Sequence, residues 1–215
     1  MLPASPVHPE GAILPEAEQP AWNAIGRVNI AGMTRRRMCT GTLVAPDTVL
    51  TAAHCVLEAG DIPAQPGEVV FAAGWRSGAP AADARAAALR LHPEFEAGLA
   101  SGEIRVLHDL ALLTLPAKLD GIAPIATAPL PEGDPVLAII GYRADRPHIA
   151  TRLAPCRVTR RGAEAFVTDC EAVTGTSGAP VLAETASGWA VVGVVSATGA
   201  VGTLAPIPRA WPAVP

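Results

Sequence analysis

Apolar residues along the chain occur in short runs separated by glycine, proline and small polar residues. Several runs alternate apolar and polar positions, as strands with one buried face do. The alanine-rich segment 79–88 suits a helix by propensity, but it has no apolar stripe at helical spacing. We therefore predict strands over residues 24–30, 38–44, 49–53, 68–73, 86–91, 110–115, 136–142, 150–158, 165–168, 179–182 and 189–196.

Prolines divide this pattern into larger segments. Residues 116–135 are proline-rich and predict a linker between two sets of strands, 22–115 and 136–215. Residues 1–21 carry many prolines and little periodicity, so we expect an extended tail or pro-segment remnant on the surface. Short strands broken by glycine and proline predict an all-β protein, either two barrels or a sandwich.

Composition narrows the class of protein. Half of the 215 residues are hydrophobic and 17% are charged, which suits a sizeable core. The net charge is −4, and we interpret the one basic run, 35–37, as the solvated tip of a hairpin turning at 31–35, so we expect no nucleic acid as partner. No stretch approaches the roughly 20 apolar residues of a membrane span, and the N-terminus shows no signal peptide.

The four cysteines fall as two local pairs, Cys39 with Cys55 and Cys156 with Cys170. Their spacing differs from the close pairs of redox and zinc sites. We predict two disulfides, each stabilising the fold by about 3 kcal/mol for loops near 15 residues, with four buried free thiols as the alternative. Disulfides imply an oxidising compartment, so we expect a secreted or periplasmic protein.

Three short stretches carry residues suited to nucleophilic catalysis. Ser177 lies between Gly175 and Gly178, on a predicted tight turn, although glycine and serine are ordinary turn residues. His54 ends an apolar run beside a cysteine, and a general base needs such a fixed backbone. Asp109 opens an apolar run, so its carboxylate needs a buried partner such as an imidazole N–H.

The other histidines have no such setting, and they lack metal-ligand spacing with Asp, Glu or Cys. We therefore expect no metal and no other cofactor. We interpret the remaining histidines as surface or core residues: His8, His92, His108 and His148.

Together the three stretches resemble the trypsin/chymotrypsin family of serine proteases. They are TAAHC at 51–55, HDLALL at 108–113 and GTSGAP at 175–180. The order of histidine, aspartate and serine differs from that of the α/β-hydrolases. The resemblance spans about residues 22–210 and implies two packed six-stranded antiparallel β-barrels of the chymotrypsin-like type, with the catalytic residues in the cleft between them.

The resemblance also implies a role for each matched residue. Ser177 would be the nucleophile, His54 the general base and later the general acid, and Asp109 the group that holds the imidazole tautomer. The N–H groups of Gly175 and Ser177 would form the oxyanion hole. Ser196 resembles the serine that donates a hydrogen bond to the triad aspartate.

The chain departs from the animal digestive enzymes at two places. Thr176 stands where those enzymes have the aspartate that pairs with the new N-terminus on activation. Cys170, with Cys156 as its expected partner, also gives a different disulfide pattern. These features look closer to the bacterial, glutamyl-endopeptidase-like branch of the family.

The same resemblance indicates which residues would form the specificity pocket. Glu171 occupies the position where trypsin-like members bind Arg or Lys, and Val195 replaces the histidine of Glu-cutting members. A small apolar substrate residue and an Arg or Lys bound by Glu171 both stay open, with the small residue preferred. The resemblance assigns the pocket and the edge that pairs with a substrate strand to Glu171, Ala172, Ser196, Ala197, Thr198 and Gly202.

The sequence thus predicts a monomeric serine endopeptidase that acts on peptide or protein substrates. Two alternatives stay open on the same fold. One is a non-catalytic binding protein with a collapsed oxyanion hole, and the other is a latent form whose N-terminal residues cover the cleft.

Overall fold

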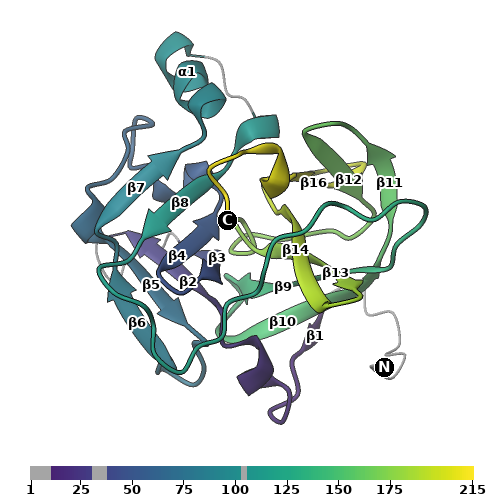
Figure 1. Ribbon diagram of the computed structural model, residues 1–215, viewed down its shortest axis with the longest axis horizontal. Helices are drawn as coiled ribbons and strands as arrows, with labels where there is room; N and C mark the ends of the chain where they lie inside the picture. Colours follow the sequence, from purple (N-terminus) through teal and green to yellow (C-terminus); the bar gives the residue numbers. More distant parts are fainter. Residues whose placement is uncertain (1–10, 31–37, 103–105) are drawn as a thin grey trace.

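The computed structural model describes residues 11–30, 38–102 and 106–215, whose strands form two groups lying side by side (Figure 1). The first group is one antiparallel sheet in the order β6-β5-β2-β3-β4-β8-β7. Its strands are β2 (Ile25–Ile30), β3 (Met38–Ala45), β4 (Thr48–Thr51), β5 (Val69–Ala73), β6 (Ala82–Arg85), β7 (Ala88–Leu91) and β8 (Ala111–Thr114).

This sheet closes on itself because one bent stretch of chain supplies both of its ends. β6 pairs with β5, β7 pairs with β8, and only Ala86 and Ala87 separate β6 from β7. Closure removes the free edges that an open sheet would expose. With β6 and β7 counted as one bent strand, the sheet is the six-stranded barrel that the sequence predicts.

The second group contains two sheets, β1-β10-β9-β13-β14 and β11-β12-β16-β15. They are continuous because β10 passes into β11 through a single residue, Arg157. The strands are β1 (Ala12–Ile13), β9 (Leu137–Arg143), β10 (Arg146–Cys156), β11 (Val158–Arg161), β12 (Ala165–Thr168), β13 (Pro180–Thr185), β14 (Gly188–Val194), β15 (Ala197–Gly199) and β16 (Gly202–Pro206). The curled sheets of the two halves confirm the predicted all-β, chymotrypsin-like fold.

Helical segments are short and lie between strands. The α-helix α1 (Pro93–Ser101) begins with proline after His92, whose ring accepts a hydrogen bond from the Glu94 N–H, and ends at Gly102 with φ +76°. Such a proline start and left-handed glycine end are favourable helix boundaries. The 3-10 turns are η1 (Gln19–Trp22), η2 (Ala53–Val56), η3 (Pro66–Glu68), η4 (Val106–His108) and η5 (Pro208–Ala210).

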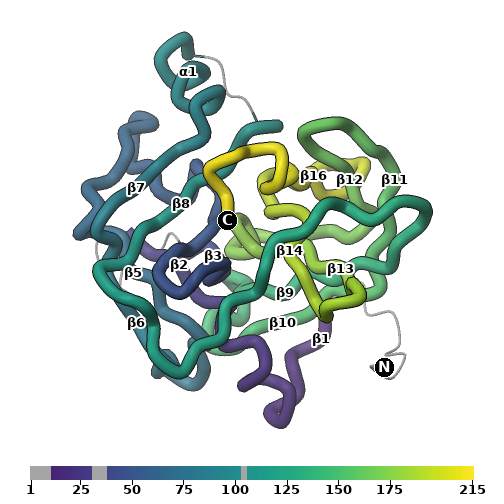
Figure 2. Tube along the Cα trace, viewed as in Figure 1, coloured from purple at the N-terminus to yellow at the C-terminus, as the bar shows by residue number. Residues whose placement is uncertain are grey.

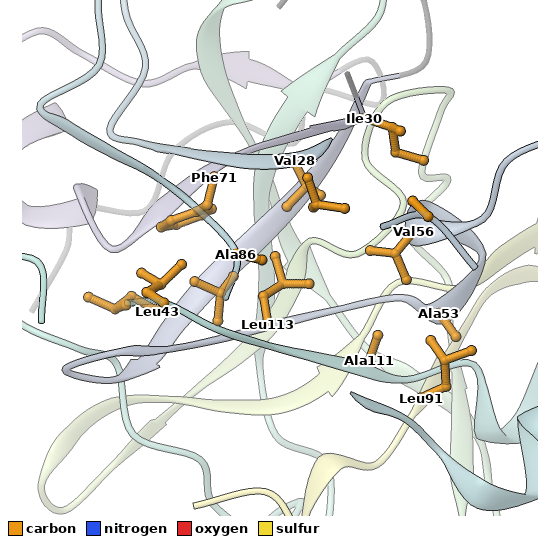
Figure 3. Packing of buried hydrophobic residues seen from close by; sticks show 14 of the residues in the cluster. Val28, Ile30, Leu43, Ala53, Val56, Phe71, Ala86, Leu91, Ala111 and Leu113 are labelled. Carbon is orange, nitrogen blue, oxygen red and sulfur yellow. The ribbon is translucent and has the colours of Figure 1, made fainter. Parts of the chain in front are cut away.

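Side chains on opposite faces of the same strands fill different cores. In the first barrel, Val28, Leu43 and Phe71 point into the interior (Figure 3). Ile25 and Leu50, on the other face of these strands, join residues of the second half in a cluster between the barrels. Burial of both faces explains why the apolar and polar alternation along these strands is incomplete.

The segment between β8 and β9 crosses from one half to the other (Figure 2). The described part of the predicted N-terminal tail also packs against the second half. β1 pairs with β10, Leu14 is only 1% exposed, and Glu18 contacts Arg152 at 2.7 Å. This part of the tail therefore adds a strand and a buried side chain to the fold.

Every predicted strand has a counterpart: β12 has the predicted bounds, and one or both ends of each of the others are shifted. The third strand ends at Thr51, and His54 lies in the turn η2 after it. The alanine-rich segment contains β6, while β1, α1, β11 and β16 match no predicted element and β15 matches only the predicted substrate-pairing edge. The predicted hairpin turn and basic run at 31–37, and residues 1–10 of the tail, lie outside the described residues.

Candidate active site

His54 lies in η2, directly after β4 of the first barrel. Its neighbours in η2 are buried, and Cys55 is joined to Cys39 of β3 by a disulfide with an S–S distance of 2.06 Å. The side chain of His54 itself is 39% exposed, so its ring reaches the surface. The local sequence thus fixes the backbone of His54 on both sides while leaving the imidazole accessible.

Asp109 orients this imidazole. Its carboxylate is buried, and it accepts hydrogen bonds from the backbone N–H of His54 at 2.9 Å and from Nδ1 of the ring at 2.6 Å. The hydroxyl of Ser196 donates a third hydrogen bond to Asp109 at 2.6 Å. Because Nδ1 carries the hydrogen in this pair, Nε2 of the neutral ring has a free lone pair and suits a proton acceptor.

The pKa of Asp109 is lowered from its ordinary value. Burial alone raises this pKa, but the hydrogen bonds and charge of His54 and the hydrogen bond from Ser196 outweigh the effect of burial. Hydrogen bonds to the ionised form stabilise it. Asp109 is therefore a carboxylate at neutral pH, and it stabilises a protonated His54.

Ser177 lies on the turn before β13, between Gly175 with φ +97° and Gly178 with φ +78°. Its carbonyl accepts a hydrogen bond from the Thr40 N–H at 2.8 Å, and the α-carbon of Gly178 packs closely against Thr51 and Ala52, just before His54. A side chain at position 178 would collide with Thr51 Oγ1. The absence of a Cβ here lets the serine turn approach the strand that leads to His54.

The Ser177 turn thus lies next to the segment that carries His54. Within the described part of the chain, however, no hydrogen bond joins the hydroxyl of Ser177 to His54. Nε2 of His54 lies 3.8 Å from the sulfur of Cys55. A second link runs through the strand end after β14: the Gly178 N–H bonds to the Val195 carbonyl at 2.7 Å, and Ser196 follows with its bond to Asp109.

Hydrogen bonds fix the two carbonyl groups that share a peptide with the N–H groups of Gly175 and Ser177. The Thr174 carbonyl accepts from the Ala144 N–H at 2.8 Å, and the Thr176 carbonyl accepts from the Ala179 N–H at 2.9 Å. In a planar peptide the N–H points opposite to the carbonyl. Among the described residues, the N–H groups of Gly175 and Ser177 have no hydrogen-bond acceptor, so both are available for an anion.

A cavity of about 430 Å³ lies beside Ser177. Of the predicted pocket residues, Ala172, Ser196 and Thr198 line it. Glu171 is exposed and, with Ala197 and Gly202, is not part of the lining. The resemblance did not assign four other lining residues to the pocket, although Thr176 and Val195 stand out in the sequence as departures from related enzymes: Val173, Thr174, Thr176 and Val195.

The predicted substrate-pairing edge coincides with β15. This strand pairs with β16 alone and ends its sheet, so among the described strands nothing pairs with its other side. Gly202, at the start of β16, has φ +111°, and a side chain there would collide with the Thr168 carbonyl. We assign Gly202 to the β15–β16 turn on this geometry.

Both predicted disulfides are present. Cys156 and Cys170 are joined by the second one, and none of the four cysteines is a free thiol, which excludes the alternative. The sulfurs of Cys39 and Cys55 lie near the His54 ring, but their disulfide leaves no thiolate to bind a metal.

His108, which precedes Asp109 in the chain, packs with a further histidine, His92. His108 contacts Glu164 at 3.1 Å and stacks on His92 at 4.7 Å. Burial and the nearby His108 both lower the pKa of His92. These contacts agree with the interpretation of both residues as structural.

Comparison with known proteins places the chain in one family. The model of the trypsin-like peptidase domain matches residues 39–194. No curated protein matches the chain in sequence. In the described residues, no helix has the length and hydropathy needed to cross a bilayer.

Solved structures share the fold at low sequence identity. A Glu endopeptidase in complex with MPD matches with a TM-score of 0.75 and 19% identity, over 92% of this chain and 90% of its own. A thermostable serine protease from an extremophilic microorganism has a TM-score of 0.68 and 21% identity, covering 88% of this chain and 92% of its own. The protease Anisep from Arthrobacter nicotinovorans has a TM-score of 0.68 and 18% identity, with coverages of 86% and 90%. The chain belongs to the family of trypsin-like peptidases.

Proposed function

We propose that the protein is a serine endopeptidase that cleaves peptide bonds through Ser177, His54 and Asp109. The observation that carries this proposal is the arrangement around Asp109. Its buried carboxylate fixes the His54 ring with Nε2 free, and His54 follows directly after the end of β4, against which the Ser177 turn packs. The family membership supports a hydrolase of this class.

The proposed reaction has two halves. In the first, Nε2 of His54 takes the proton of the Ser177 hydroxyl while the oxygen bonds to the substrate carbonyl carbon. His54 then gives the proton to the leaving amine, and an acyl-enzyme remains. In the second, a water loses its proton to His54 and attacks the ester, and the proton returns to Ser177. Asp109 stabilises the protonated ring in both halves.

The N–H groups of Gly175 and Ser177 would stabilise the negative oxygen of each tetrahedral intermediate. Removal of one such donor costs about 10²–10³ in rate where it has been tested. Thr176 supports this role without the usual aspartate: its N–H and hydroxyl bond to the Val173 carbonyl at 3.0 Å and 2.5 Å. We infer that these contacts, with those of Thr40 and Ala144, hold the oxyanion hole without an N-terminal ion pair.

We further propose that the protein acts on peptides as a monomer and that it is secreted or periplasmic. The two disulfides support an oxidising compartment. We also retain the proposed boundaries, with barrels at 22–115 and 136–215 joined by a linker at 116–135. The strands of the two groups lie within these limits, except β1.

The proposal is tested by labelling with a fluorophosphonate probe, which reacts with activated serines. We expect the wild-type protein to be labelled and the Ser177→Ala variant to lose labelling completely. Ser187→Ala, which alters an exposed hairpin serine, is the matched control and should be labelled like wild type. Absence of labelling in folded wild-type protein would favour the non-catalytic alternative.

A further inference from the structure

The cavity beside Ser177 has an unusual balance of hydrogen-bond donors and acceptors. No charged residue of the described chain lines it, and all of its polar side chains are hydroxyls, those of Thr174, Thr176, Ser177, Ser196 and Thr198. A hydroxyl has one hydrogen to donate and two lone pairs to accept with. The direction in which each hydrogen points therefore decides what the cavity offers to a ligand.

The hydroxyl of Thr198 is oriented by a residue behind the wall, Thr203, which is fully buried. Thr203 donates to the carbonyl of Cys170 at 2.6 Å and accepts from the N–H of Ala172 at 2.9 Å. A carbonyl only accepts and an amide only donates, so the hydrogen of Thr203 is committed to Cys170. In its 3.3 Å contact with Thr203, Thr198 is therefore the donor.

Two other lining hydroxyls also send their hydrogens into the protein. Ser196 donates to Asp109 at 2.6 Å, and Thr176 donates to the Val173 carbonyl at 2.5 Å. Both partners can only accept. On this wall of the cavity, the hydroxyl oxygens of Ser196, Thr176 and Thr198 can therefore only accept a hydrogen bond from a ligand.

We infer that the cavity accepts an uncharged substrate side chain that donates a hydrogen bond, such as the amide of glutamine or asparagine. This inference rests on the proposed function and names the substrate residue before the cut bond. A carboxylate has lone pairs only and would meet the lone pairs of the wall. A lysine or arginine would be buried without a counter-charge, because Glu171 is exposed and outside the lining.

Thr203 acts in this scheme as a positioning residue, since it does not line the cavity and works through Thr198. Valine at position 203 would keep the shape of the side chain but remove the acceptor for the Thr198 hydrogen. That hydrogen would then be free to turn toward the cavity. The preference for a donating side chain over a carboxylate should therefore weaken.

The test measures binding to the Ser177→Ala protein, which leaves peptides intact. Three peptides differ only in the residue at the cleavage position, which is Gln, Glu or Lys, and Gln and Glu are nearly equal in shape. We expect the Gln peptide to bind about 3- to 10-fold more tightly than the Glu peptide, the value of one net hydrogen bond. Equal or tighter binding of the Glu or the Lys peptide would overturn the inference.

The role of Thr203 is tested by a second substitution in the same background. Thr203→Val should bring the Gln-to-Glu affinity ratio toward one, whereas Thr203→Ser, which keeps the hydroxyl, should preserve it. Thr151→Val, at a buried threonine of β10 away from the cavity, is the matched control and should leave the ratio unchanged. An unchanged ratio in folded Thr203→Val protein, or a ratio lost in Thr203→Ser, would overturn the positioning role.

Cleavage of the same peptides by the wild-type protein separates this inference from the proposed function. If the wild type cuts none of them, nor a peptide library, the peptidase proposal fails, while the binding ratio still decides what the cavity prefers. If it cuts them, the order of kcat/KM should follow the order of affinity, and a higher kcat/KM for Glu than for Gln would contradict the inference.

Discussion

At the scale of single residues, the site depends on one buried carboxylate. Asp109 receives two hydrogen bonds from His54 and one from Ser196, and both residues are far from Asp109 in the chain. Burial of an ionised carboxylate is unfavourable unless such partners compensate it. The same contacts that stabilise the charge also set the position and tautomer of the imidazole.

Asp109→Asn tests this coupling. The amide is nearly equal in size, but its NH₂ group would favour the wrong tautomer of His54, with the hydrogen on Nε2. We expect kcat to fall by about 10⁴-fold, as estimated for triads of this kind. Asp120→Asn, in an exposed loop, is the control, and the comparison uses a fluorogenic peptide. A loss below tenfold would contradict the proposed role of Asp109.

The lowered pKa of Asp109 also predicts how stability depends on pH. A carboxyl group whose pKa is lower in the folded state stabilises the fold above its unfolded pKa of about 3.9, and this contribution is lost as pH falls through the folded pKa. The gap in unfolding free energy between wild type and Asp109→Asn should therefore narrow below about pH 4. Urea unfolding from pH 7 to pH 2 measures this gap, and a constant gap would refute the explanation.

At the scale of elements, the turn that carries Ser177 depends on close approach between the two barrels. Gly178 contacts the Thr40 carbonyl of β3 and Thr51 of β4, so the turn lies directly on the first barrel. The turn and the strands that position His54 are therefore one packed unit. A side chain added at Gly178 should therefore affect both stability and catalysis.

Gly178→Ala is the corresponding variant. It adds a Cβ at a left-handed φ of +78° and against backbone atoms that have no room to move. Gly188→Ala is a matched control, because φ is also positive there, +104°, but the space around it is open. We expect Gly178→Ala to lower the unfolding free energy by about 1–3 kcal/mol more than Gly188→Ala and to abolish fluorophosphonate labelling. Equal effects in chemical denaturation would show that the contact is unimportant.

At the scale of the whole molecule, an apolar cluster between the barrels fixes the cleft. It joins Ile25 and Leu50 of the first barrel to Ile140 and Leu182 of the second. Leu14 of the N-terminal segment belongs to the same cluster. His54 and Asp109 on the first barrel and Ser177 on the second, the proposed catalytic residues, keep their relative positions only while this cluster stays packed.

Leu14→Ala tests the contribution of the N-terminal segment. Removal of a fully buried leucine side chain costs about 2–5 kcal/mol, because it loses burial and leaves a cavity. The neighbouring Ile13 is 49% exposed, and Ile13→Ala should cost less than about 1 kcal/mol. Guanidinium unfolding compares the two, and a similar small cost for both would mean that the segment is a passive tail.

The sequence alone determined the features that reside in local patterns. Apolar runs predicted the strands, because strand formation depends on short-range propensity and turn residues. Motifs around His54, Asp109 and Ser177 and the cysteine spacing predicted the family and both disulfides, because catalysis and cross-linking require particular residue types.

Only the tertiary structure decided what depends on contacts between distant segments. It moved His54 from a strand end into η2, packed the described part of the N-terminal segment against the second barrel, and placed Glu171 outside the cavity lining. It also revealed Thr203, which belongs to no motif and matters only through its hydrogen bonds. Such properties arise from packing and hydrogen-bond direction between residues far apart in sequence, which local patterns do not encode.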